Sequence, residues 1–497
     1  MVFAATMSSP EIPWSDLLPL LILLGGACSL LLLGTLVPNW PRIATPIVTI
    51  ATAVAAGIAS CVQWNDLHYR KGYSIISQSI NIDRFAVLAT LIITVAVALA
   101  ALLASAHNDS ANGDPLERFA LLLTSAIGAV VMVAANDLIV LFLGLEILSL
   151  SLYLMAASDR RREESQEAGL KYFVLGGFAS AFLLYGIALI YGATASTNIS
   201  GIAAALDERI TVGGSDAMLL VGIGLMLVGL GFKVSAAPFQ IWTPDVYEGA
   251  PSSVTSYMAS AGKVAAFAAI LRVFLVGLES RVDDWRPVIW VLAVLSIFVG
   301  STMAVVQTNV KRMLAYSSIS HAGFILVGVE AAAHMEGNGL SSSMSYLAIY
   351  TMLVMGSFGI VIAVAGSGDT ATSLEAFKGL AKRRPALALA FSTLLFAQAG
   401  VPFTSGFVAK FGVIKAAVEV NSSGLAIAAM VGAVIGAFLY LRIVVSMWME
   451  EPTTDEVLEI PSVISVVIGI SVAFTLIVGF FPNIVLHAID LVRFAPN

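Results

Sequence analysis

Long apolar runs alternate with short polar segments along almost the whole chain. Each run is about 18–25 residues long, which suits a membrane-spanning helix, and none alternates strictly as a transmembrane strand would. Because a bilayer admits only helices or a closed barrel, we expect an all-α polytopic membrane protein. About fourteen spans are predicted, near residues 16–37, 42–62, 84–106, 117–135, 137–157, 169–193, 218–242, 252–277, 286–307, 313–331, 344–365, 386–418, 423–448 and 462–490.

The polar segments between these runs are too short to hold a soluble domain. Of the 497 residues, 59% are hydrophobic and 11% charged, against roughly 25% charged residues in a soluble domain. The first run exceeds the apolar part of a signal peptide and has no basic flank, so we expect a retained first helix. The longest connecting segments are 63–83, 194–217, 366–385 and 449–461.

No segment has the pattern of a cofactor-binding fold. The sequence contains no cysteine cluster, no P-loop and no G-x-G-x-x-G between a strand and a helix. Cys28 and Cys61 fall inside predicted spans, and we interpret them as small buried apolar residues without metal-binding spacing. We therefore expect no cofactor and no metal in this chain, lipid around it, and no nucleic-acid partner.

Loop charges predict the orientation of the spans. Lysine and arginine are more frequent in the loops that join spans one to two, three to four and the pairs that follow than in the loops of the opposite side. The positive-inside rule places the richer side in the cytoplasm. With an even number of spans, both termini are then expected outside.

Two predicted spans contain a proline in their middle, Pro238 in the seventh and Pro402 in the twelfth. Proline removes a backbone hydrogen bond, and a membrane tolerates this only where protein or water satisfies the freed groups. The two spans are five apart, an odd number, so two copies of a five-helix unit would enter the membrane from opposite sides. This predicts an inverted repeat. The expected parts are 1–110 with spans one to three, 111–280 with spans four to eight, 281–450 with spans nine to thirteen, and 451–497 with the last span.

Five ionisable residues lie deep inside the apolar spans: Glu146, Lys233, Lys263, His321 and Lys410. A charge at the bilayer centre costs roughly 3 kcal/mol on insertion scales, so ionisable residues at this depth typically mark a proton or ion path. Within the expected repeat, Glu146 would match His321 and Lys233 would match Lys410.

Glu146 and Lys233 are predicted to act as a pair. Burial favours the neutral form of a lysine, whereas a nearby carboxylate favours the charged form. At about 4 Å and an effective dielectric of about 20 the attraction is on the order of 4 kcal/mol, so moving Glu146 would load or unload Lys233 with a proton. The alternative for Glu146 is a protonated carboxyl that bonds to a neighbouring helix.

His321 is expected to relay protons, because the ordinary pKa of histidine is about 6.5. Tyr316, Ser317 and Ser318 would supply hydroxyl groups near it. The alternative is a histidine that only satisfies a backbone carbonyl. Lys415 and Arg272 lie nearer span ends and are expected to extend their charges towards the interface. The predicted path runs along the membrane plane in the order Glu146, Lys233, Lys263, His321, Lys410.

Charged residues outside the spans have simpler interpretations. Arg160, Arg161 and Arg162 are interpreted as a solvated cytoplasmic loop. Asp245 and Glu248 are interpreted as caps of the short turn between spans seven and eight. The alternative for these two carboxylates is a role in proton uptake.

Three segments carry a resemblance to a known family: FKVSAAPFQIWTPDVYEGAP, KRMLAYSSISHAGF and AGVPFTSGFVAKF. The chain resembles the antiporter-like membrane subunits of respiratory complex I (NADH–quinone oxidoreductase), and most closely the subunit N branch. The sequence predicts no long lateral C-terminal helix of the kind usual in the related subunit L. Lys410 stands where the related subunit M has a glutamate.

The resemblance implies roles for four of the buried residues, Glu146, Lys233, Lys263 and Lys410, in a bacterial cell membrane. It implies proton pumping driven by quinone reduction in other subunits. NADH, FMN, iron–sulfur clusters and quinone are then expected in partner subunits, and the direct partners are other membrane-arm subunits. The alternative is a subunit of an Mrp-type Na⁺(K⁺)/H⁺ antiporter, which shares the fold and the lysines. A purely structural scaffold is disfavoured by the insertion cost of five buried ionisable groups.

Overall fold

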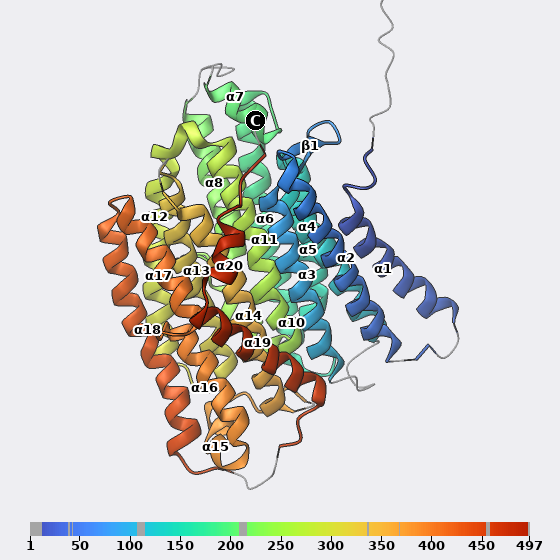
Figure 1. The fold of residues 1–497 in the computed structure, drawn as a ribbon, viewed down its shortest axis with the longest axis vertical. Coiled ribbons are helices and arrows are strands. Elements are labelled where there is room, and N and C mark those ends of the chain that lie inside the picture. Colours follow the sequence, from blue (N-terminus) through green and yellow to red (C-terminus); the bar gives the residue numbers. More distant parts are fainter. Residues whose placement is uncertain are drawn as a thin grey trace, which may run out of the picture.

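The computed structural model describes residues 12–37, 40–41, 43–106, 115–207, 216–334, 337–366, 368–453 and 458–495. Within them, 13 helices are long and apolar enough to cross a membrane. A further span is divided into two shorter helices, so the prediction of about fourteen spans and an all-α membrane fold is confirmed. Figure 1 shows these helices side by side, with α1 and α2 at one edge and α18 at the opposite edge.

The long helices are α1 (Leu18–Leu36), α2 (Ala44–Tyr69), α3 (Arg84–Ser105), α4 (Pro115–Ala134), α5 (Leu138–Ala156), α6 (Glu163–Thr194), α8 (Asp216–Val234), α12 (Val282–Val305), α13 (Val310–Ala332), α14 (Gly339–Ala365), α18 (Ser423–Met449) and α19 (Ser462–Phe480). The eighth span is built from α10 (Ser252–Tyr257), the π-helix η2 (Met258–Gly262), α11 (Lys263–Arg272) and the π-helix η3 (Val273–Gly277). The divided span consists of α16 (Pro385–Ala399) and α17 (Ser405–Glu419).

Short elements cover the two ends of the bundle. One end carries the antiparallel hairpin β1 (Tyr73–Ile75) and β2 (Ile80–Ile82), together with α7 (Ile199–Asp207). The opposite end carries η5 (Leu374–Phe377) and α15 (Leu380–Arg383). The remaining short helices are α9 (Trp242–Gly249), η4 (Glu279–Arg281) and α20 (Asn483–Ile489).

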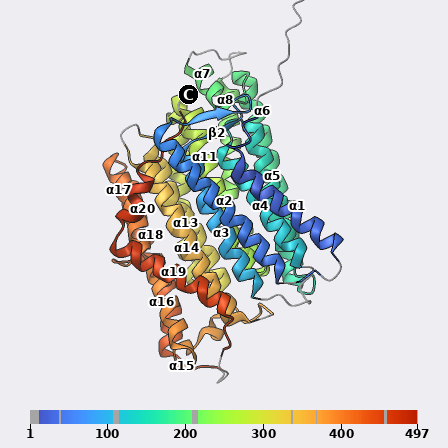
Figure 2. The ribbon, with the colours of Figure 1, turned by 45° about the vertical axis from the view of Figure 1, so that its right-hand side comes forward.

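The eighth, tenth and eleventh spans form the centre of the bundle, because nearly all of their residues are buried. By contrast, α1 and α2 expose much of their surface, and Figure 2 shows them in front of the other helices. Cys28 on α1 and Cys61 on α2 are exposed, so the prediction that they are buried is wrong. Small apolar residues of edge helices face outward as readily as inward when lipid is the solvent.

Both predicted interruptions are present. Helix α8 ends at Val234, Ser235 takes a left-handed conformation with φ of 64°, and the chain resumes a helix only at α9. Helix α16 ends at Ala399, Gly400 has φ of 93°, and α17 begins at Ser405. A left-handed residue after the last turn is a common way for a helix to end, and glycine adopts it without a Cβ clash.

Two junctions at opposite ends of the bundle share one design. The side chain of Asp137 caps α5, and the side chain of Asn309 caps α13. Each cap belongs to an antiparallel bridge, made with Asn198 before α7 and with Ser373 before η5. The matching backbone hydrogen bonds, all 2.7–2.8 Å long, are Leu138 N to Thr197 O and Ile199 N to Asn136 O in the first junction, and Val310 N to Thr372 O and Leu374 N to Thr308 O in the second.

Close helix contacts repeat in the same register. A Cβ on Gly128 would collide with Gly144 O and Leu148 N, and a Cβ on Gly300 would collide with Tyr316 O and Ser320 N. Gly300, Tyr316 and Ser320 follow Gly128, Gly144 and Leu148, respectively, by the same number of residues by which Asn309 follows Asp137. These matches support two related units that start at opposite ends of the bundle, although the repeat itself stays a prediction.

The shared register corrects one detail of the predicted repeat. It aligns Glu146 with Ser318 and Ser149 with His321, so Glu146 and His321 differ by one helical turn. The predicted match followed the ionisable residues alone. The glycine contacts and the helix caps determine which residues of the two units correspond.

Arg272 does not reach the interface, contrary to the prediction. Its side chain is 1% exposed and forms two bonds to the carboxylate of Asp83, of 2.8 and 3.0 Å. The rings of Phe85 and Phe494 lie 5.0 and 5.5 Å from the guanidinium, and Ala495 N donates to Asp83. The buried ion pair therefore joins α3, the eighth span and the C-terminal segment.

We expect Arg272→Met to destabilise the subunit by about 3–5 kcal/mol, because it leaves the carboxylate of Asp83 buried without its charged partner. The double variant Asp83→Leu/Arg272→Met should recover most of this loss. The measurement is the thermal stability of the purified protein together with its level in the membrane. Equal stability of the single and double variants would contradict the prediction.

Candidate functional site

Lys233 lies in the last turn of α8, directly before the interruption, and is 6% exposed. Its ammonium donates to Ser149 Oγ at 2.7 Å and to Tyr172 Oη at 3.3 Å. The rings of Tyr153 and Tyr172 lie 5.7 and 5.3 Å from the ammonium. Lys233 therefore faces the interior of the bundle, where hydroxyl groups and aromatic faces receive its charge.

Glu146 lies one turn before Ser149 on α5 and is half-buried. The structure describes both Glu146 and Lys233 and places no ion pair between them; instead the carboxylate accepts a hydrogen bond from Ser180 on α6. Glu146 on α5 thus lies one turn from Ser149, which accepts from Lys233 of α8, but the two predicted partners form no ion pair in this conformation. In this conformation the carboxylate is bonded to Ser180 and attracts the ammonium of Lys233 only through space.

Lys263 begins α11, immediately after the π-helix η2, and is 1% exposed. Its ammonium donates to the backbone carbonyl of Ser318 on α13, and the ring of Tyr350 lies 5.7 Å away. Tyr350 Oη donates to Ser318 Oγ at 2.7 Å. π-helical turns are rare and occur frequently at functional sites, because they shift one side chain relative to a regular helix.

His321 is 3% exposed and is held by two tyrosines. Its Nδ1 is 2.6 Å from Tyr346 Oη, and its Nε2 is 3.1 Å from Tyr440 Oη. Tyr440 Oη is also 2.6 Å from Ser317 Oγ, which leads to Gln398 at 3.4 Å. Both ring nitrogens therefore bond to hydroxyl groups, and no backbone carbonyl is needed to satisfy them.

Lys410 lies on α17 and faces the interruption of the twelfth span. Its ammonium donates to the carbonyl of Ala399 at 3.1 Å, and the ring of Phe324 lies 4.7 Å away. Ala399 is the last residue of α16, so its carbonyl lacks the continuing helix that would otherwise satisfy it. Lys415, further along α17, is exposed and pairs with Glu419 at 3.5 Å, as expected for a residue outside the path.

The contacts link neighbouring members of the predicted path in two groups. Glu146 and Lys233 are linked through Ser149 and its turn on α5. Lys263 on α11 donates to Ser318 of α13, the helix that carries His321, and Phe324 lies between His321 and Lys410, 6.5 Å from the imidazole ring. Next to Lys233, the ring of Tyr172 stacks on that of Trp242, and Trp242 contacts Tyr247. The order and role of the five residues stay predictions.

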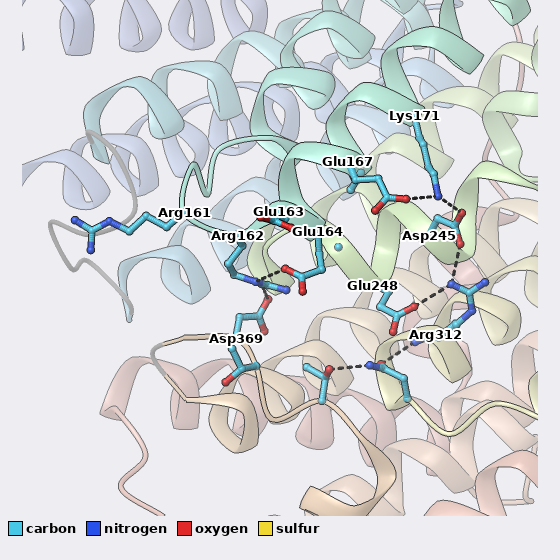
Figure 3. Close-up of a pocket in the computed structure, with 15 residues that line it drawn as sticks. Arg161, Arg162, Glu163, Glu164, Glu167, Lys171, Asp245, Glu248, Arg312 and Asp369 are labelled. Carbon is cyan, nitrogen blue, oxygen red and sulfur yellow. Dashed lines mark hydrogen bonds and ion pairs between the residues drawn. The ribbon is translucent and has the colours of Figure 1, made fainter.

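A charged cavity of about 640 Å³ opens at the end of the bundle that is rich in lysine and arginine (Figure 3). Asp245 on α9 binds Lys171 at 2.8 Å and Arg312 at 2.7 Å, and Glu248 binds Arg312 at 2.9 Å. Asp245 and Glu248 thus join α6, α9 and α13 by ion pairs rather than capping a turn, so that interpretation is wrong. Their predicted alternative role in proton uptake stays open.

Asp369 is the central anion of a second, adjacent group. It accepts hydrogen bonds from Ser252 N at 2.9 Å and Ser252 Oγ at 2.6 Å, and pairs with Lys311 at 2.9 Å and Arg162 at 3.4 Å. Lys311 is fully buried and Arg162 largely so. The solvated-loop interpretation therefore fails for Arg162, whereas Arg160 is exposed and pairs only weakly with Glu117 at 3.8 Å.

Comparisons with known proteins agree with this geometry. The family described as NADH:quinone oxidoreductase/Mrp antiporter, TM has a model that matches residues 135–436. The chain belongs to this family. It is 40% identical to "NADH-quinone oxidoreductase subunit N 1" of Herpetosiphon aurantiacus over 484 residues, which cover 96% of each chain.

Two solved structures share the fold of this antiporter-family chain. A chain of respiratory complex I from Thermus thermophilus with bound aureothin is 29% identical, with a TM-score of 0.79, and the match covers 96% of this chain and all of that one. A chain of the Mrp complex from Dietzia sp. is 20% identical, with a TM-score of 0.83 and 97% coverage of each chain. At that identity the Mrp likeness shows the fold alone.

The structure adds polar residues to the candidate path of this antiporter-family protein that the sequence analysis missed. Tyr346 and Tyr350 lie one turn apart on α14, and Tyr440 lies on α18. Their spacing was a usable signal, because two tyrosines four residues apart on one face of an intramembrane helix need nearby hydrogen-bond partners. Of the predicted fillers, Ser317 and Ser318 take part in the hydrogen bonds.

The Asp369 junction predicts a pH dependence. Burial alone would raise the pKa of Asp369, but Lys311 and Ser252 outweigh it and hold the pKa below its ordinary value of 3.8. The junction should then contribute its full stability above about pH 4 and lose it as the pH falls through the lower pKa of the folded state. We expect Asp369→Asn to lower the Tm by several degrees at pH 6 and to have little effect at the acid limit.

The measurement is thermal unfolding of the detergent-solubilised protein at a series of pH values. Asp283→Asn is the matched control, because Asp283 is exposed and, among the described residues, forms a weak ion pair with Arg286 at 3.7 Å. A loss of stability in Asp369→Asn that is equal at every pH would rule out the ionised carboxylate as its cause.

Proposed function

We propose that this chain is the subunit N-type, proton-translocating membrane subunit of a bacterial NADH:quinone oxidoreductase. The observation that carries the proposal is the pair of buried lysines at the two helix interruptions. Lys233 and Lys410 each place an ammonium inside the bundle, and the path between them includes Lys263 and His321. Inserting these ionisable residues into the membrane costs free energy, and a purely structural scaffold would gain nothing in return. We therefore infer that they carry protons. The subunit N relatives support the choice of complex.

In the proposed mechanism the distance between Glu146 and Lys233 sets the protonation of the lysine. With the carboxylate turned to Ser180, the ammonium has only hydroxyl and aromatic contacts, and this favours release of its proton. With the carboxylate turned towards Lys233, the charged lysine is favoured and takes up a proton. Lys263 Nζ, the His321 ring nitrogens and Lys410 Nζ then pass protons along the membrane plane.

The driving reaction belongs to other subunits in this proposal. NADH, FMN, iron–sulfur clusters and quinone would be held by partner subunits, and this chain would contribute no redox site to the translocase. Its neighbours would be other antiporter-like and small subunits of the membrane arm. Both termini would lie on the outer side of the cell membrane, with the charged cavity on the cytoplasmic side. The two five-helix units, 111–280 and 281–450, would be related by an axis in the membrane plane.

We expect Glu146→Ala and Lys233→Ala to lower the number of protons pumped per NADH oxidised while the subunit stays in the assembled complex. Lys233→Arg should fail to restore pumping, because a guanidinium remains protonated and cannot unload. The measurement is proton uptake into inside-out vesicles together with the rate of NADH oxidation. Pumping by Lys233→Arg at the parent level would contradict a mechanism in which Lys233 takes up and releases a proton.

The Mrp-type antiporter remains the second candidate, since the Dietzia Mrp chain shares the fold with a TM-score of 0.83. The two candidates differ in the proteins that accompany this chain. We expect flavin- and iron–sulfur-containing subunits to co-purify with it in mild detergent, identified by mass spectrometry and by their visible absorption. Co-purification with other antiporter subunits alone, together with Na⁺-dependent proton exchange in proteoliposomes, would favour the Mrp type.

A further inference from the structure

The crossing of α6 and α9 separates Lys233 from the charged cavity. On α6, Lys171 lines the cavity, and the next residue, Tyr172, contacts the ammonium of Lys233. On α9, Asp245 lines the cavity and Trp242 lies one turn earlier, inside the bundle. The same two helices thus contribute a charged layer on the cavity side and an aromatic layer on the lysine side.

The aromatic layer is tightly built. The rings of Tyr172 and Trp242 stack with centroids 4.4 Å apart and an angle of 8° between their planes, and both residues are buried. The indole N–H of Trp242 donates to the carbonyl of Phe232 at 3.0 Å. Phe232 lies in the last turn of α8, and its carbonyl accepts from both Ser235 N at 3.0 Å and the indole N–H, so Trp242 is bonded to the end of the broken helix. This bond fixes the indole next to Lys233.

The charged layer ties the same helices together. Lys171 binds Asp245 at 2.8 Å, Asp245 binds Arg312 at 2.7 Å, and Arg312 binds Glu248 at 2.9 Å. Figure 3 shows these side chains meeting across the cavity from α6, α9 and α13. Since Lys171 adjoins Tyr172 and Asp245 follows Trp242 by one turn, α9 cannot move away from α6 without breaking both layers.

We propose that Lys171, Asp245, Arg312 and Glu248 form a latch that keeps the Tyr172–Trp242 stack closed over Lys233. The stack is the gate between Lys233 and the water of the cavity, and the four charged residues are positioning residues that act through it. The proposal rests on the proposed function, because it gives Lys233 a solvent side from which protons arrive.

In this proposal the latch also depends on the second unit, residues 281–450, through Arg312. Arg312 lies on α13, the helix that presents the Ser318 carbonyl to Lys263 and carries His321. A shift of α13 that follows a change of charge at these residues would move the guanidinium away from Asp245 and Glu248. Access to Lys233 in the first unit would then depend on the protonation state of the second.

The test places a thiol beside Lys233. Ser149→Cys puts the reporter next to the ammonium, in a background in which the two native cysteines, Cys28 and Cys61, are replaced by alanine. The assembled complex in inside-out vesicles is treated with a charged, membrane-impermeant methanethiosulfonate, and labelling is followed by mass spectrometry. The parent thiol should react slowly because the gate is closed.

We expect Trp242→Ala and the double variant Lys171→Gln/Asp245→Asn to raise the labelling rate about tenfold, equivalent to about 1.4 kcal/mol in the closed-to-open equilibrium. Lys171→Arg/Asp245→Glu, which keeps the ion pair, should label near the parent rate. Arg312→Gln, which retains the Lys171 bond, should give an intermediate rate and serves if the double variant does not assemble. Arg160→Gln is the matched control, because it removes an exposed ion pair on the same side.

Parent-rate labelling in Trp242→Ala and in the latch variants, or rapid labelling of the parent itself, would overturn the proposal. Thiol labelling reports the gate whether or not the chain pumps protons, whereas the Glu146→Ala measurement reports pumping whether or not the gate exists. Failure of the gate and failure of the proposed function are therefore separate outcomes. If both hold, latch variants should also keep oxidising NADH with fewer protons moved per NADH.

Discussion

An ammonium group inside a membrane must find hydrogen-bond acceptors, and this requirement shapes the centre of the molecule. A continuous helix satisfies its own carbonyls and has few to offer, whereas an interrupted helix exposes carbonyls at its ends. Lys410 uses the carbonyl of Ala399 at the end of α16. At the other interruption the carbonyl of Phe232 accepts from Ser235 N and from the indole of Trp242, and Lys233 donates to the hydroxyls of Ser149 and Tyr172. The breaks are thus part of the environment of the lysines, not defects beside them.

Helix α13 connects the groups that lie between these two interruptions. One face presents the Ser318 carbonyl to Lys263, another carries His321 between two tyrosines, and its first turn sends Lys311 and Arg312 to the charged cavity. Because α13 is buried along nearly its whole length, it cannot move without changing contacts on every side. The proposed latch would use this packing to transmit a change of charge in the middle of α13 to its first turn.

The span count, the two interruptions and the burial of Lys233, Lys263, His321 and Lys410 could be predicted from the sequence, because each depends on local composition or on a single proline. The partners in the buried ion pairs could not be predicted from the sequence. Asp83 and Arg272 are far apart in the chain and look like ordinary ends of spans, and only the fold brings them together. Lys311 looks like a loop lysine, but the bridge between Asn309 and Ser373 carries it inside. The register between the two units could not be predicted either, because it depends on glycine contacts and helix caps that appear only in the folded structure.

The separation of Glu146 from Lys233 has meaning only together with the closed stack of Tyr172 and Trp242. A lysine that has lost its carboxylate partner would lose its proton to any water within reach, on whichever side the water lies. In this conformation the stacked rings of Tyr172 and Trp242 lie next to the ammonium, which donates to Ser149 Oγ and Tyr172 Oη. If the stack is the proposed gate, a proton released here is directed away from the cavity and towards the interior. In this proposal the direction of transfer follows from the order of two events, closing the stack first and turning the carboxylate second.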